Sequence, residues 1–166
     1  MIIAVVGVRG NDKRKLGRAL ARRLAARFYD ACDSTPASGN TEDWLDLTSN
    51  VLRDPGPRKH LVVACPALRR AQRDRLRGAC EGLRFVFINP ASLMVDGSQR
   101  QPPHQPSSYR SVLARRLAVL EPPTGSEDAL LVDDDGPPVE TVADRVVARF
   151  MVQTNPDEPA SSRTDS

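Results

Sequence analysis

The residues near the start of the chain have the types and spacing of a phosphate-binding loop. An apolar run ends at Gly7, and Lys13 follows six positions later. These two residues match the first glycine and the lysine of the pattern G-x-x-x-x-G-K-[ST], in which backbone N–H groups and the lysine hold phosphates and the last hydroxyl holds magnesium. The candidate phosphate-binding residues are therefore Gly7, Gly10, Lys13 and Arg14.

Two positions of this pattern carry other residues. Asp12 stands where the second glycine belongs, and Arg14 stands where the magnesium-binding hydroxyl belongs. A carboxylate about 5 Å from a phosphate charge, at an effective dielectric constant of about 20, repels it by about 3 kcal/mol, roughly a hundredfold in affinity. Arg9, Lys13, Arg14 and Lys15 make the turn cationic. The turn could therefore hold an anion at a helix N-terminus without the metal geometry that phosphoryl transfer needs.

The elements that must position these residues alternate between strands and helices. Apolar runs predict strands in residues 2–6, 28–30, 61–64, 83–88 and 129–132. Apolar residues at helical spacing predict helices in residues 13–27, 41–54, 67–80, 109–120 and 139–152. In the third of these helices the pattern places Leu68, Ala71 and Leu76 inward and Arg73 elsewhere. This alternation predicts a parallel sheet with helices on both faces.

The length and composition predict one domain. Residues 1–152 form that domain in our interpretation, with a Gln-, Pro- and Ser-rich loop at 97–108, and residues 153–166 form a disordered tail. Basic residues number 24 and acidic residues 21, which is typical of a mixed surface and argues against a nucleic-acid-binding face. Aromatic residues for base stacking are also scarce.

The cysteines and the apolar runs indicate in which cellular compartment the protein is expected. Cys32, Cys65 and Cys80 are odd in number and widely spaced, which argues against a disulfide framework and against a zinc site. We predict no metal-ligating set and no signal peptide. Because no apolar run approaches the length of a membrane span, we expect a soluble, cytoplasmic protein that does not act at a membrane.

Six stretches of the chain, taken in order, match one set of family motifs. They are G-V-R-G-N-D-K-R-K-L-G-R-A-L-A (7–21), F-Y-D-A-C-D-S-T-P (28–36), W-L-D (44–46), V-V-A-C-P-A-L-R-R-A-Q-R-D-R-L-R (62–77), L-E-P-P (120–123) and V-D-D-D-G-P-P-V-E (132–140). The most specific stretch, 65–77, is close to C-S-A-L-K-R-x-Y-R-D-x-L-R. On these residues the chain resembles the gluconate kinases, or gluconokinases, which are P-loop kinases related to shikimate and adenylate kinases.

The resemblance implies a fold and an ancestral reaction. The fold is a three-layer α/β arrangement with a parallel five-stranded sheet in the order 2-3-1-4-5. The reaction moves the γ-phosphoryl group of ATP to a hydroxyl of gluconate, with ATP and Mg²⁺ as the implied cofactors. The family also implies an anion-binding role for the basic residue after the A-L pair, which here is Arg69 or Arg70.

The acceptor site and the lid of the family are altered in this chain. The family has G-D-x-x-H-P where this chain has Cys32 in place of the aspartate and Thr35 in place of the histidine. Asp33, together with Lys13, is the candidate catalytic residue, and a simple loop carboxylate is the alternative interpretation of Asp33. The family lid carries R-K-G-H-F-M, for which Arg100 and His104 are the candidates to stand in; exposed loop residues are the alternative.

Two hypotheses from different classes follow. In the first, the chain is a gluconokinase-like protein that is weakly active or inactive and is kept for binding a small anion, a nucleotide, a protein partner or a second copy of itself. In the second, it is an active ATP-dependent carbohydrate kinase with a rearranged loop, in which Lys13 and Asp33 suffice and another carboxylate holds magnesium.

Overall fold

The apolar run at the start of the chain forms β1 (Ile2–Gly7), the central strand of a parallel five-stranded sheet. The structure, a computed structural model, describes residues 1–33, 43–57, 59–90 and 107–154. The strand order is β2-β3-β1-β4-β5, which confirms the order expected from the family. β1 pairs with β3, Val6 opposite Cys65, and with β4, Gly7 opposite Ile88.

The predicted strands and helices are present, with boundaries that move by a few residues. The other strands are β2 (Arg27–Asp30), β3 (Leu61–Cys65), β4 (Leu83–Asn89) and β5 (Ala129–Asp133). The helices are α1 (Gly10–Arg23), α2 (Asp43–Arg53), α3 (Arg70–Ala79), α5 (Ser107–Ala118) and α6 (Val139–Thr154), with a short 3-10 turn, η1 (Gly125–Glu127). No helix in the described part of the chain is long and apolar enough to span a membrane.

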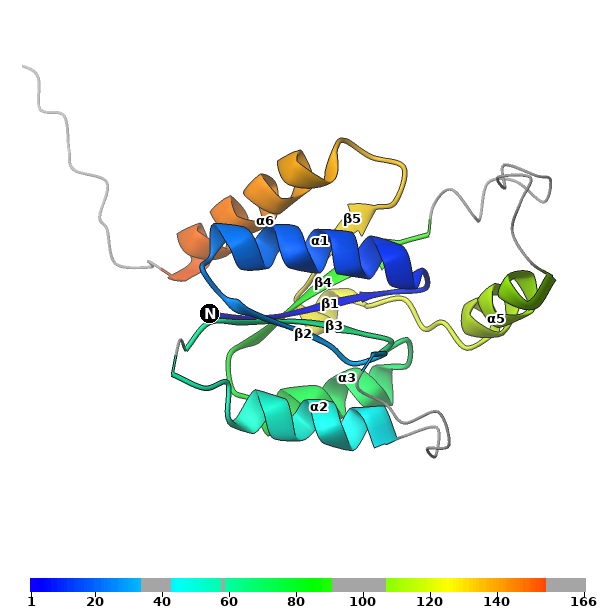
Figure 1. The fold of residues 1–166 in the computed structure, drawn as a ribbon, viewed down its shortest axis with the longest axis horizontal. Helices are drawn as coiled ribbons and strands as arrows, with labels where there is room; N and C mark the ends of the chain where they lie inside the picture. The colour runs from blue at the N-terminus through cyan, green and yellow to red at the C-terminus, as the bar shows by residue number, and fades with distance from the viewer. Residues whose placement is uncertain (34–42, 58, 91–106, 155–166) are drawn as a thin grey trace, which may run out of the picture.

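The helices cover both faces of the sheet and make three layers. α1 and α6 lie on one face, and α2 and α3 lie on the other (Figure 1). Because side chains alternate along a strand, Ile3 and Val5 of β1 pack under α1 and α6, whereas Ala4 and Val6 pack with the residues of α2 and α3. Trp44 of α2 is buried in this second cluster.

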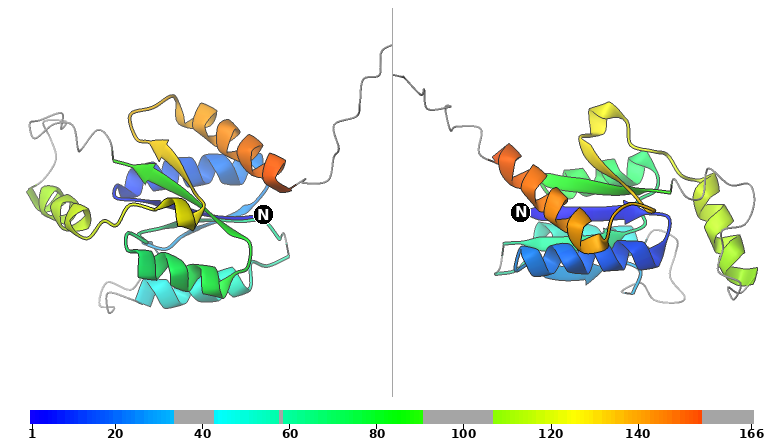
Figure 2. Two further views of the ribbon diagram at one scale, coloured as in Figure 1. Left: turned by 180° about the vertical axis from the view of Figure 1, so that it is seen from behind. Right: turned by 90° about the horizontal axis from the view of Figure 1, so that it is seen from above.

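All the parallel strands end at one edge of the sheet, and the candidate residues gather there. The β1–α1 turn, the end of β2 and the start of α3 share this edge, and α5 stands beyond it (Figures 1 and 2). In open parallel sheets ligands bind at this edge, where the carboxyl ends of the strands meet the N-termini of helices. The fold therefore brings the chemistry-bearing residues of distant segments together.

The inward face of α3 differs from the one predicted. Arg73 is fully buried, and Ala71 is exposed. The prediction was wrong because α3 begins at Arg70 rather than near Ala67, and because Arg73 has a buried partner, Glu127 of η1, with which it forms two hydrogen bonds of 2.7 and 2.9 Å. Leu47 of α2 and Val112 of α5 are apolar residues that lie exposed on their helices.

Two segmental predictions lie partly or wholly outside the described residues. α6 continues through Thr154, two residues into the predicted tail, and residues 155–166 lie outside the described ranges. The predicted loop at 97–108 likewise lies outside them, except for its last two residues, which begin α5.

Candidate functional site

The connection between β1 and α1 is short. α1 begins at Gly10, so that only Val8 and Arg9 separate the strand from the helix. Arg9 has an extended backbone, and its carbonyl oxygen accepts the N–H of Lys13 at 3.4 Å in the first helical turn. A loop whose N–H groups converge on a phosphate needs residues in the left-handed region. Among the described residues, positive φ angles occur only at Ala25, Gly56, Lys59, Gly82 and Asp128.

The absence of a side chain at Gly7 lets the end of β1 pack closely against β4. A Cβ atom at this position would lie 3.1 Å from the Cβ atom of Ile88 on the neighbouring strand β4. A Cβ atom at Gly10 would meet nothing within 4 Å. The first glycine of the motif therefore allows the turn to pack closely against β4, and Gly10 faces open space at the start of α1.

The side chain of Lys13 closes the turn from inside. Lys13 is 1 % exposed, and its Nζ donates hydrogen bonds to the carbonyl oxygens of Gly7 at 2.8 Å and Arg9 at 3.3 Å. Burial lowers the pKa of Lys13, an effect that the nearby sulfur of Cys32 partly offsets. The lysine that would contact phosphates in an open loop is thus hydrogen-bonded to the loop itself.

Arg14 connects the start of α1 to the end of β2. Its Nε donates to Oδ2 of Asp30 at 2.5 Å, and its Nη2 donates to Oδ1 of Asp33. The hydrogen bond with Asp30 raises the pKa of Arg14. The other oxygen of Asp30 accepts the N–H of Cys32 at 2.9 Å. Asp33, the candidate catalytic carboxylate, is therefore an ion-pair partner of Arg14 and is well exposed.

The residues at this edge do not fit the magnesium ion that the family implies. Magnesium takes oxygen ligands, and a guanidinium at position 14 offers only N–H donors. Two carboxylates of this edge, Asp30 and Asp33, are both bound by that guanidinium. Within the described ranges, no group of three or more His, Cys, Asp or Glu side chains could hold a metal ion.

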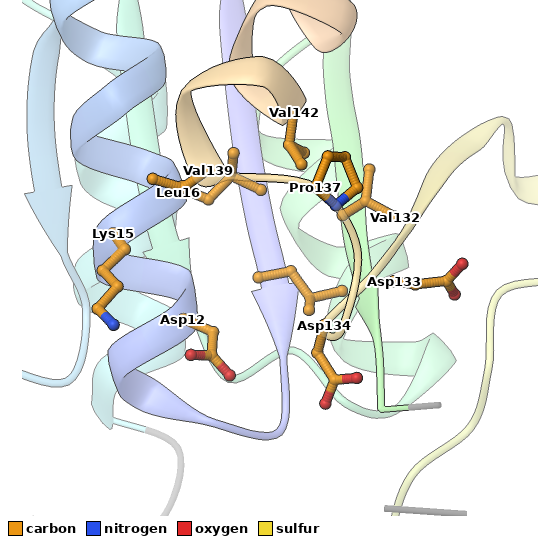
Figure 3. A pocket seen from close by; sticks show the side chains of 10 residues that line it. Asp12, Lys15, Leu16, Val132, Asp133, Asp134, Pro137, Val139 and Val142 are labelled. Atoms are coloured by element: carbon orange, nitrogen blue, oxygen red, sulfur yellow. The ribbon is translucent and has the colours of Figure 1, made fainter. Parts of the chain in front are cut away.

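Asp12 does not fill the turn but lines a small cavity beside it. The cavity, of about 200 Å³, lies between α1 and the segment that joins β5 to α6, and Figure 3 shows the carboxylates of Asp12 and Asp134 at the end near the turn. Its lining residues are Asp12, Lys15, Leu16, Ile88, Val132, Asp133, Asp134, Pro137, Val139 and Val142. Binding pockets for whole small molecules usually measure about 300–1,000 Å³, so this cavity is smaller than a site for a whole small molecule.

The N-terminus of α3 is already capped by a carboxylate of the chain. Arg70 donates its backbone N–H to Oε2 of Glu121 at 2.7 Å, and its side chain lies 3.7 Å from Asp74. The backbone N–H of Glu121 bonds to the carbonyl oxygen of Leu68 at 2.9 Å. The predicted anion-binding residues are Arg69 and Arg70. They lie at the edge of the sheet where the strands end, next to the carboxylate of Glu121.

Arg116 is a residue of this edge that the sequence did not reveal. It lies on α5, and its Nη1 donates to the carbonyl oxygen of Val8 at 2.9 Å, across 108 positions of sequence. No spacing in the chain signals such a contact, because it depends on where α5 docks. Arg100 and His104, the predicted lid residues, lie outside the described residues.

Cys65 lies behind the turn as a packing residue, as its family position suggests. It is fully buried, and burial raises the pKa of its thiol to about 12, so that the thiol stays neutral and unreactive.

The fold brings five of the predicted site residues together at one edge of the sheet. They are Gly7, Gly10, Lys13, Arg14 and Asp33.

Comparison with known proteins points to one group of enzymes. No family model matches the chain. A gluconokinase of Gluconobacter oxydans is 29% identical over 168 residues, covering 91% of this chain and 92% of that protein. The crystal structure of a gluconokinase from Sinorhizobium meliloti superposes with a TM-score of 0.68 at 26% identity over 92% of this chain and 96% of that one. A sugar kinase from Janibacter, at 22% identity and a TM-score of 0.69, shares the fold over 91% of this chain and 94% of that one.

Proposed function

This chain belongs to the gluconokinase family of P-loop kinases, and from that premise we propose that it binds a small anion at the β1–α1 edge and transfers phosphoryl groups weakly or not at all. The ancestral reaction is the transfer of phosphate from ATP to gluconate. In this proposal the scaffold of that reaction is kept, and the parts that act on the phosphoryl group are altered.

The observation that carries the proposal is the closed β1–α1 turn. The ammonium group of Lys13 is bound to the carbonyl oxygens of Gly7 and Arg9, and the helix begins at Gly10. Phosphoryl transfer depends on backbone N–H groups and a lysine that surround the phosphates. To form that arrangement this chain would have to unwind the first turn of α1 and break both hydrogen bonds of Lys13.

The other altered positions act in the same direction. Arg14 replaces the hydroxyl that would hold magnesium, and Cys32 replaces the acceptor-site aspartate of the family. Asp33, which could serve as a base, is paired with Arg14. Groups that act together in catalysis lose most of their effect when any one is removed, so several such changes argue against ordinary kinase turnover.

Anion binding remains compatible with this edge. The first turn of α1 carries N–H groups without helical partners, and the dipole of the helix favours a negative charge there. Arg9, which is 30 % exposed and lies 3.8 Å from the carboxylate of Asp134, and Arg116 contribute positive charge beside the same turn. Gly10 leaves open space in front of the helix. The occupant that fits is a small anion such as phosphate or the carboxylate of a sugar acid.

A second candidate function is an active ATP-dependent carbohydrate kinase with a rearranged loop. Two observations favour it: Lys13 keeps its motif position, and a cavity lies next to Asp12, close to the turn. This function requires the turn to open when ATP binds, with magnesium held by a carboxylate other than Asp30 or Asp33. We further propose a cytoplasmic location, and a protein partner or a second copy of the chain as further ligands.

Calorimetric titration separates the two functions. The wild-type protein is titrated with inorganic phosphate, with gluconate and with ATP–Mg²⁺, and ADP release is followed in a coupled assay. We expect binding of a small anion and no ADP release above background. Micromolar ATP binding with turnover that Lys13→Ala abolishes, and that Arg22→Ala on the same helix, away from this edge, leaves intact, would overturn the proposal.

A further inference from the structure

We propose that the guanidinium of Arg14 permanently replaces the divalent cation at this edge, so that the chain binds no Mg²⁺ there and takes its anion without a metal. The inference rests on the proposed function for the location of the anion site. The metal measurement described below does not require an anion, and the two can therefore fail separately.

The geometry places one guanidinium between two carboxylates. Arg14 is the fifth residue of α1, at the position of the magnesium-binding hydroxyl in the phosphate-loop pattern. Two different nitrogens are used: Nε donates to Asp30 and Nη2 to Asp33. The carboxylate of Asp30 is 9 % exposed, whereas that of Asp33 is 61 % exposed. The guanidinium therefore joins a nearly buried anion at the end of β2 to an exposed one three residues later.

The orientation of Asp30 is set within the chain at both of its oxygens. Oδ2 accepts Nε of Arg14, and Oδ1 accepts the backbone N–H of Cys32 at 2.9 Å. A metal approaching Asp30 would have to displace a charged donor from one oxygen or share the other with a backbone donor. In addition, Cys32 stands where the family pattern has a carboxylate, so one oxygen ligand that a metal could use is missing from the sequence.

An arginine can supply the charge of a metal ion but not its coordination. Its guanidinium stays protonated at any working pH, has several N–H donors and accepts no ligand. It can neutralise Asp30 and Asp33 and hydrogen-bond a phosphate or carboxylate oxygen with the donors that remain. It cannot take oxygen atoms into a coordination shell, and its positive charge repels a second cation.

Metal binding tests the inference directly, with Mn²⁺ as a paramagnetic probe in place of Mg²⁺. Wild-type protein is compared with Arg14→Ser, which removes the guanidinium from both carboxylates and adds a hydroxyl, and with the double variant Arg14→Ser/Asp30→Asn. Arg22→Ser is the matched control, because it removes another ion-paired arginine of α1, the partner of Glu140, away from this edge. Circular dichroism establishes that each variant is folded.

We expect no saturable Mn²⁺ binding in the wild type or in Arg22→Ser. We expect one site in Arg14→Ser, at least about tenfold tighter than any wild-type binding, that the added Asp30→Asn substitution removes, because hard cations need the freed carboxylate oxygens. A saturable Mn²⁺ site that is present in the wild type and absent from Arg14→Ser/Asp30→Asn would overturn the inference, as would an Arg14→Ser variant that is folded and gains no site.

The same inference fixes the metal dependence of anion binding. Titration of wild-type protein with inorganic phosphate in the presence of a chelator, and then with excess Mg²⁺, should give the same affinity. A clear gain with Mg²⁺ would contradict a built-in cation. A complete absence of phosphate binding would count against the proposed function and would leave the Mn²⁺ result to decide on Arg14.

Discussion

The ammonium nitrogen of Lys13 lies 2.8 Å from the carbonyl oxygen of Gly7, so the lysine of the phosphate-loop pattern is bound to the first glycine of that same pattern. This contact joins the first turn of α1 to the last residue of β1. In a phosphate-binding loop these two residues would surround a phosphate, whereas here they are hydrogen-bonded to each other. Several testable properties of the protein depend on it and on the ion pairs around it.

The first prediction concerns the pH dependence of stability that Lys13 causes. Burial lowers the pKa of Lys13 below 10.5 in the folded protein, so the unfolded chain binds more protons and stability rises with pH. Keeping the buried lysine charged lowers the free energy of unfolding. This loss is complete below the lowered pKa of the folded protein and disappears above 10.5, the pKa of lysine in the unfolded chain. Urea unfolding of the wild type and of Lys13→Met, at about pH 7 and about pH 10, should show the wild type gaining stability relative to the variant as pH increases. A difference that stays constant across this range would contradict the prediction.

The second prediction concerns the buried pair of Arg73 and Glu127. Removing one partner of a buried ion pair costs about 3–5 kcal/mol, because the other charge is left unpaired. Glu127→Gln should therefore lower the free energy of unfolding by this amount, whereas Asp46→Asn, which breaks an exposed pair with Arg75, should change it by less than about 1 kcal/mol. If the two substitutions lower the free energy of unfolding by similar amounts, the buried pair contributes no more to stability than the exposed pair.

Acid should weaken the same pair. The hydrogen bond from Arg73 lowers the pKa of Glu127 to about 2, from an ordinary value of 4.5. The stability from this ionised carboxylate is complete above about pH 4.5 and is lost as the pH falls toward about 2, with a total of about 3 kcal/mol. Glu127→Gln should show a smaller loss of stability than the wild type over this range. An equal acid dependence in both proteins would argue against the lowered pKa.

The contact between Arg116 and Val8 predicts how α5 is held. Arg116 provides a hydrogen bond from α5 to the β1–α1 turn, and Leu113 of the same helix is a buried apolar side chain. Arg116→Gln should therefore speed amide hydrogen exchange in α5 several-fold, with little change in α1 beyond its first turn. Arg115→Gln, an exposed neighbour, is the control. Equal exchange in the two variants would mean that the Arg116 contact does not anchor α5.

Restoring the motif should change how the edge binds nucleotide. Asp12→Gly with Arg14→Ser gives the full pattern G-x-x-x-x-G-K-S, removes the repelling carboxylate and places a poor helix former in the first turn of α1. We expect the double variant to gain Mg²⁺-dependent ATP binding of roughly a hundredfold over the wild type, the size of the repulsion attributed to Asp12. Titration calorimetry of both proteins measures this gain, and equal affinities would show that these two residues are not what closes the loop.

The fold could be predicted from the sequence because its signals are local and repeated. The continuous apolar runs of β1, β3 and β4 and the helical spacing in α1 are each sufficient to place an element, and the family motifs supply the strand order. Arg73 was misplaced because a charged residue counts as outward in such patterns, although it lies three residues before the buried Leu76 on the same helical face. Its partner, Glu127, is 54 positions away, and no local pattern connects the two.

The candidate site could be predicted only as a set of residues. The sequence identified Gly7, Lys13, Arg14 and Asp33, and the sheet brings all of them to one edge. It could not show that Lys13 bonds to the turn or that Arg14 bonds to Asp30, because both depend on where α1 begins and how closely β2 approaches it.

The most direct measurement is ADP release by the wild-type protein with ATP, Mg²⁺ and gluconate, compared with Lys13→Ala under the same conditions. If the closed turn has removed phosphoryl transfer, the two proteins release ADP at the same background rate. A wild-type rate well above background that falls to background in Lys13→Ala would contradict the loss of catalysis and would show that the turn opens to form a working phosphate site.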